Sequence, residues 1–169
     1  VVRWSVCTPA SVPDFSAVSY FFGRELQRHL DIPLGLINCS WGGTRAESWT
    51  SRPELETLQC LTQRLARADA AVRNYTPEGA QREYVRALQQ WAQDRIDAQI
   101  QNLPLPRQPS VWNPYQSPHQ PASLFNAMIN PLIPFAVRGV IWYQGEANVA
   151  QAQDYRSVFP ALINDWRER

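Results

Sequence analysis

Apolar residues along the chain recur first at helical spacing and then in short continuous runs. Between Asp14 and Asp31 they fall three or four positions apart, and Asp14 or Ser16 stands where a helix would be capped. The next run, "PLGLI" at 33–37, is apolar on both faces, as expected of a central parallel strand covered by helices. A helix followed by a buried strand and a glycine turn predicts an α/β fold.

Two apolar stripes follow within residues 51–102 and predict a pair of helices. The string "SRPE" from Ser51 has the form of a capping box. A second helix is expected to open at Thr76, because the proline that follows is favoured at a first helical position. We therefore expect an antiparallel helical hairpin inserted between sheet elements. Its outer faces are polar, so ordinary packing is favoured over a partner-binding coiled coil.

Residues 103–122 form a proline-rich loop, which predicts an extended segment ordered against the surface by Trp112 and Tyr115. A second buried strand is expected within "VRGVIWYQG", 137–145, and a final helix begins near Asp154 with an apolar face of 3.6-residue period. The pattern predicts one domain with an open parallel sheet. Only two of the roughly five strands that such a sheet normally has are evident.

Composition narrows the classes of function. The 169 residues suit one domain with a sizeable core, and a net charge of +1 does not point to nucleic acid or an acidic membrane surface as a partner. No apolar run approaches the roughly 18 residues needed to span a bilayer. Cys7, Cys39 and Cys60 do not support a disulfide framework, and no Cys/His spacing of the zinc-binding kind occurs.

Both predicted strands end in glycine-containing strings that also carry aromatic and polar residues. "WGGT" begins at Trp41, and "YQGEAN" begins at Tyr143. Ligands bind outside the carboxyl ends of parallel strands, so the two strings should lie at the same edge of the sheet. A glycine N–H and a side-chain amide that meet there have the layout of an oxyanion hole. The alternative is that both glycines only form turns.

Four strings together resemble the sialate O-acetylesterase family of the SGNH hydrolase superfamily, to which plant-type carbohydrate esterases with acetylxylan activity are related. The strings are "FSAVSYFFGRELQRHL", "GLINCSWGGTRAESW", "SLFNAMINPLIPFAVRGVIWYQGEAN" and "YRSVFPALINDWR". They cover Asp14–Trp49 and Ser123–Arg167, and residues 51–122 match only loosely. The resemblance implies a three-layer α/β/α (flavodoxin-like) fold, here incomplete, and hydrolysis of acetyl esters on sugars without a cofactor.

In such enzymes a serine attacks the acetyl carbonyl, and a histidine takes its proton and later returns one to the leaving sugar hydroxyl. By position, the resemblance assigns the oxyanion hole to the backbone of Gly42 or Gly43 and to the side chain of Gln144. The family's Gly-Gln-Ser-Asn nucleophile string and its Asp-x-x-His string do not occur in this sequence. The two histidines, His29 and His119, are not expected to act as the base.

We therefore expect an internal fragment of a secreted or periplasmic esterase, inactive alone, whose partners are the acetylated carbohydrate and the missing parts of the same domain. Candidate substrate contacts are Trp41, Arg45 and Tyr143, and candidates for holding the shape of the site are Thr44, Glu47, Glu146 and Asn148.

Two alternatives come from other classes of protein. The first is a non-catalytic carbohydrate-binding or structural protein on the same scaffold. The second is a glycosidase that uses Glu47 and Glu146 as its pair of carboxylates. The residues favour a structural role for both glutamates over this glycosidase pair.

Overall fold

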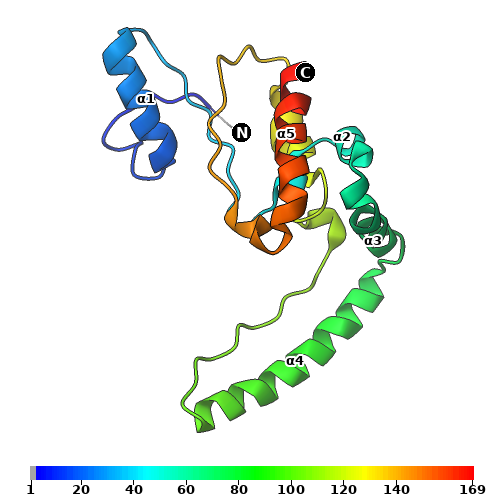
Figure 1. Ribbon diagram of the computed structural model, residues 1–169. Helices are drawn as coiled ribbons and strands as arrows, with labels where there is room; N and C mark the ends of the chain where they lie inside the picture. Colours follow the sequence, from blue (N-terminus) through cyan, green and yellow to red (C-terminus); the bar gives the residue numbers. More distant parts are fainter. Residues whose placement is uncertain (1–2) are drawn as a thin grey trace. The chain divides into compact units, whose positions relative to one another are not determined.

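The computed structural model describes residues 3–169, and the chain forms two compact units (Figure 1). The first unit holds the described residues up to Gly42 together with Phe135–Tyr143. The second unit holds Gly43–Pro134 and Gln144–Arg169. The chain therefore passes from one unit to the other within both glycine-containing strings.

The predicted parallel sheet is wrong, because no strand occurs among residues 3–169. The segments expected to be buried strands run as irregular backbone in the first unit, and their apolar side chains are partly exposed. Leu34 is 37% exposed and Val140 is 60% exposed. An extended segment gains its hydrogen bonds only from neighbouring strands, so local apolar composition cannot hold it as a strand without them. The three-layer α/β/α architecture is corrected to a helical one.

The first predicted helix is confirmed as α1, Ala17–Leu30. Its N-cap is Ser16, whose Oγ accepts a hydrogen bond from the Ser19 N–H at 3.3 Å. The helix ends at Asp31, which adopts a left-handed conformation with φ 50°. Gly23 faces Leu36 so closely that an added Cβ would lie 2.6 Å from a Leu36 methyl carbon. This contact packs α1 against the following apolar segment.

The core of the second unit gathers around α5, Ala152–Glu168. This helix packs against the 3₁₀ helix η1, Ala46–Trp49, and against α2, Arg52–Thr57 (Figure 1). Val158 and Leu162 of the predicted apolar face are 0% and 2% exposed, which confirms the period read from the sequence. The structure starts this helix two residues before the predicted Asp154.

The expected capping box at Ser51 does not form, since the Ser51 side chain makes no capping bond to α2. Its Oγ instead donates to Asp165 Oδ1 at 2.7 Å, and its N–H donates to Asp165 Oδ2 at 2.8 Å. Asp165 is 4% exposed. A buried carboxylate needs donors, so the tertiary contact takes precedence over the local cap.

The helices of the expected hairpin are α3, Thr62–Arg73, and α4, Pro77–Ile100. The cap at Thr76 is confirmed, because its hydroxyl accepts from the Gly79 N–H at 3.1 Å. The antiparallel packing of these two helices stays a prediction.

The proline-rich loop is held near its end by an aromatic cluster. The ring of Tyr75 meets Trp112 and Tyr115 edge to face, with centroids 6.2 Å and 5.9 Å away. The predicted anchoring through these two rings is confirmed. The remaining short helices are the 3₁₀ helices η2 (Gln59–Leu61), η3 (Pro114–Gln116), η5 (Asn130–Leu132) and η6 (Glu146–Gln151) and the π-helix η4 (Phe125–Ile129).

Among residues 3–169, no helix is both long and apolar enough to cross a membrane. Over the same residues, no cluster of His, Cys, Asp and Glu side chains has the makings of a metal site. Cys7, Cys39 and Cys60 are all free of disulfides, and burial raises the pKa of the Cys39 thiol.

Candidate functional site

The two glycine-containing strings meet in the second unit through side-chain hydrogen bonds, although 100 residues or more separate them along the chain. Asn148 Oδ1 accepts from the Ala46 N–H at 3.0 Å. The Gln144 side-chain amide donates to the Thr44 carbonyl at 3.1 Å. Asn148 is 1% exposed and Thr44 is 3% exposed. The sequence prediction that the strings lie side by side therefore holds for these residues, without the sheet that was expected to place them.

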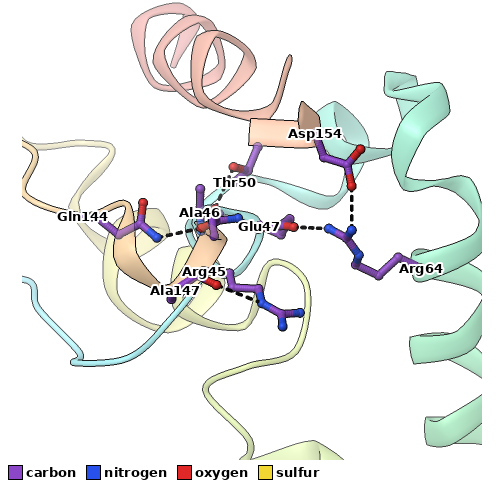
Figure 2. Close-up of polar contacts among 9 residues, drawn as sticks. Arg45, Ala46, Glu47, Thr50, Arg64, Gln144, Ala147 and Asp154 are labelled. Atoms are coloured by element: carbon purple, nitrogen blue, oxygen red, sulfur yellow. Dashed lines mark hydrogen bonds and ion pairs between the residues drawn. The ribbon is translucent and has the colours of Figure 1, made fainter. Parts of the chain in front are cut away.

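Glu47 is the charged centre of this contact, with 4% exposure. One carboxylate oxygen accepts from Arg64, and the other accepts from Asn148 Nδ2 at 2.8 Å. Arg64 also donates to Asp154 Oδ2 at 2.6 Å, so one guanidinium joins η1 to the start of α5 (Figure 2). A buried charge is tolerated only when it is paired and hydrogen-bonded, and this network meets that condition.

Gln144 is held by two bonds from the same nitrogen. Nε2 donates to the Thr44 carbonyl and, at 2.7 Å, to Asn148 Oδ1. A primary amide has two hydrogens, so both are already engaged. The amide oxygen is buried and has no hydrogen-bond partner among the described residues. To stabilise an oxyanion, as predicted from the sequence, Gln144 would exchange one of these bonds; the longer one, to Thr44, is the weaker of the two.

The two glycines of the first string differ in conformation. Gly43 has φ +73°, in the left-handed region that favours glycine, whereas Gly42 has no positive φ. An added Cβ would meet no atom within 4 Å at either position. Glycine is therefore required at Gly43 by backbone conformation and not by crowding. The assignment of either N–H to an oxyanion stays a prediction.

The candidate substrate contacts fall in both units. Trp41 and Tyr143 belong to the first unit and are 55% and 80% exposed. Arg45 belongs to the second unit, where its Nε donates to the Ala147 carbonyl at 3.3 Å. Its terminal nitrogens lie on the side away from Ala147 (Figure 2). Their contacts with a substrate stay predictions.

The glycosidase pair gains no support from the structure. Both oxygens of Glu47 are occupied by Arg64 and Asn148, so this carboxylate is neither a free nucleophile nor a poised acid. Glu146 is exposed at the start of η6. The preference for a structural role is consistent with these contacts of Glu47.

Neither histidine is placed as a base. The side chain of His29 is 70% exposed, and its Nδ1 lies 2.9 Å from the Glu25 carbonyl oxygen within α1. His119 is exposed, and the bond recorded for it is from its backbone N–H to Ser117 Oγ at 3.3 Å. His119 does line a pocket of about 290 Å³ beside Glu47 and Arg64.

Sequence reasoning missed Arg64 and Asp154 as parts of the network. Each lies on a predicted helix with no local motif around it. Arg64 joins the two carboxylates, with Glu47 17 residues before it and Asp154 90 residues after it. The one available signal was the glutamate placed among buried positions of the first string, which requires a cation somewhere in the fold.

Most of the chain, including both glycine-containing strings, is similar in sequence to known proteins. The chain is 34% identical over 154 residues to the mouse protein named sialate O-acetylesterase, which is 90% of this chain and 25% of that protein. Proteins of the same name from Pongo abelii and Homo sapiens are 35% and 34% identical over 157 residues, 90% of this chain and 21% of each. No family model and no solved structure matches the chain.

The resemblance inferred from the motifs is thereby confirmed, and it extends beyond them to most of residues 51–122. The similarity to several sialate O-acetylesterases supports an esterase classification for the chain. The chain spans a quarter or less of the length of the curated relatives that it matches.

Proposed function

We propose that this chain forms part of a carbohydrate esterase that removes O-acetyl groups from sialic acid or a related sugar. The observation that carries the proposal is the similarity to sialate O-acetylesterases over 90% of the chain. The buried contact between the two strings supports it, since Thr44, Gln144 and Asn148 are fixed together where the resemblance places the acetyl carbonyl.

In this proposal the chain supplies the oxyanion side of the site. A serine outside these residues attacks the acetyl carbonyl, and the negative charge that develops on the carbonyl oxygen is stabilised by Gly42 or Gly43 N–H and by Gln144. Glu47 and Asn148 act as positioning residues, because their hydrogen bonds set where the Gln144 amide lies. The protein works in the periplasm or outside the cell, where acetylated polysaccharides and glycans are met.

A second candidate is a non-catalytic carbohydrate-binding protein on the same scaffold. The observation in its favour is that both amide hydrogens of Gln144 are already bonded within the protein. It predicts that the surrounding coding DNA also lacks the nucleophile and histidine strings, whereas the esterase predicts Gly-Gln-Ser-Asn upstream and Asp-x-x-His downstream.

The first experiment is acetate release from an aryl acetate and from O-acetylated N-acetylneuraminic acid. The 169-residue chain should release none above background, since the family's nucleophile string is absent from it. Turnover by this chain that a single serine substitution within it abolishes would contradict the assignment of the nucleophile to other residues.

The second experiment uses the longest protein that the coding DNA specifies. Gln144→Ala should lower kcat by about 10²-fold or more if the amide stabilises the oxyanion. Gln153→Ala, an exposed position on α5, is the matched control and should leave kcat unchanged. An active enzyme that keeps its kcat in Gln144→Ala would remove Gln144 from the oxyanion hole.

A further inference from the structure

The long helix α4 carries a row of apolar side chains that face water. Val85, Ile96 and Ile100 are 44%, 50% and 78% exposed, and Ala92 between them is also exposed. Since an α-helix has 3.6 residues per turn, these four side chains lie within about 80° of one another around the axis. They form one continuous stripe along residues 85–100, which we call the α4 stripe.

The other side of α4 is already packed. Ala80 and Ala98 are each 9% exposed, and Trp91 Nε1 donates to the Pro106 carbonyl at 2.9 Å, so the proline-rich loop lies against that side. The helix α3 is a poor partner for the α4 stripe, because its Leu65 is already buried within the second unit. The stripe is therefore open to a partner from outside these residues.

Charged residues beside the α4 stripe indicate the kind of partner. Arg86 follows Val85 and Asp97 follows Ile96, so the two charges lie on the same flank of the stripe, about three turns apart. Neither charge makes an ion pair with another side chain among residues 3–169. The apolar pair and the charged pair thus repeat the same spacing along one helix.

This repeated spacing is complementary to itself when it is reversed. In an antiparallel pair of α4 helices, Val85 can meet Ile96 of a second copy. The residues one position further then lie about 3 Å apart along the axis, so Arg86 comes within reach of Asp97 of the second copy. Two-fold symmetry forms the same ion pair at both ends of the contact. A parallel pair would instead place like charges together, which is destabilising.

We propose that the α4 stripe is a self-association surface on which a second copy of this chain packs antiparallel. Ala92 near its centre lets the two backbones approach. Arg95, on the opposite flank, already lies over the Trp91 ring at 5.5 Å from the centroid and leaves the stripe uncovered. None of these residues belongs to the network around Gln144, so the surface does not depend on the esterase assignment.

The dimer should be weak. α4 has 24 residues, so it is about 36 Å long, and it offers few apolar side chains beside the roughly 20–30 residues a side of a stable interface. We expect a Kd of about 10–100 µM, which makes association depend on protein concentration.

Sedimentation equilibrium of the purified chain between about 1 and 500 µM tests the surface. The chain should pass from monomer to dimer. Ile96→Ser removes an exposed side chain that occurs twice in the dimer, so it should raise the Kd at least about 100-fold and leave the urea midpoint unchanged. Glu83→Ser, nearly opposite on α4, is the matched control and should keep the original Kd. A chain that stays monomeric at 500 µM, or a dimer that Ile96→Ser does not weaken, would overturn the proposal.

Charge reversal tests the direction of packing at low ionic strength. Arg86→Asp and Asp97→Arg should each weaken the dimer about tenfold, because each turns two attractive contacts into repulsive ones. The double variant Arg86→Asp/Asp97→Arg restores opposite charges and should recover the original Kd. Asp94→Arg makes the same change of net charge on the opposite face of α4 and should have no effect. An unchanged Kd in Arg86→Asp, or no recovery in the double variant, contradicts antiparallel packing.

Other occupants of the α4 stripe give a different result. Cover by α3 or by another part of the parent would keep the longest protein that the coding DNA specifies monomeric, and Ile96→Ser would then lower its urea midpoint. That combination removes the self-association surface, even in an active esterase. Conversely, a dimer that responds to Ile96→Ser as expected keeps the surface even where no acetate is released.

Discussion

Asn148 is the side chain whose loss should be most damaging to the second unit. It is 1% exposed, accepts from the Ala46 N–H and Gln144, and donates to Glu47. Asn148→Ala leaves the buried Ala46 N–H without an acceptor and removes one of the donors of a buried carboxylate. Each such loss costs about 1–3 kcal/mol. Since the terms are not additive and a water can enter the space, we expect a total of about 3 kcal/mol.

Urea unfolding followed by tryptophan fluorescence measures this cost. With a slope of about 2 kcal/mol per molar urea, a loss of 3 kcal/mol lowers the midpoint by about 1.5 M. Asn148→Asp should cost at least as much, because it replaces the donor to Glu47 by a second carboxylate. The control Asn164→Ala changes an exposed side chain of α5 and should stay within about 0.5 kcal/mol. A midpoint shift below about 0.5 M in Asn148→Ala, with an unchanged slope, would refute the view that this side chain joins the two strings.

Two further predictions concern the ion pair between Arg52 of α2 and Asp69 of α3, and the turn at Gly43. The hydrogen bond from Arg52 lowers the pKa of Asp69, so the pair stabilises the folded state above the ordinary aspartate range and is lost as pH falls below about 4. Asp69→Asn should therefore flatten the curve of urea midpoint against pH below pH 5. At pH 7 it should cost no more than about 1 kcal/mol, because both side chains are over a third exposed. An unchanged curve would count against a stabilising role of the pair. Gly43→Ala should cost about 1 kcal/mol in the same urea assay, because φ is +73° there. Gly42→Ala should cost less than half as much, and equal costs would contradict the conformational reason.

Helices were predictable because their signals are local. The hydroxyls at Ser16 and Thr76 cap the helices that follow them, and the apolar period of the final helix places Val158 in the core. Each of these signals spans a few residues, so no knowledge of the rest of the chain is needed. A strand has no such signal of its own. The apolar runs at 33–37 and 137–142 indicated burial, and burial alone does not fix a β conformation.

Long-range polar contacts could be predicted only in part. Ser51 looked like a cap because the glutamate of the capping box stands three residues after it, yet the buried carboxylate of Asp165, 114 residues away, takes its hydroxyl. In a capping box this hydroxyl would accept a hydrogen bond from the backbone of its own helix, whereas here it donates to a distant carboxylate. The two glycine-containing strings were predicted to lie side by side, and Thr44 and Gln144 do so. The argument was a shared sheet edge, whereas the structure joins them by a hydrogen bond from the Gln144 side chain.

The replacement of a sheet edge by a hydrogen-bonded network changes which residues control Gln144. On a sheet edge, backbone ladders would fix the amide, and single side chains would matter little. Here its position depends on a chain of contacts in which Arg64 holds Glu47, Glu47 holds Asn148, and Asn148 holds Gln144. Arg64 also binds Asp154 at the start of α5, so the same guanidinium that neutralises Glu47 ties the network to the core helix. Substitution of Arg64, Glu47 or Asn148 should therefore displace the Gln144 amide in addition to lowering the stability of the second unit.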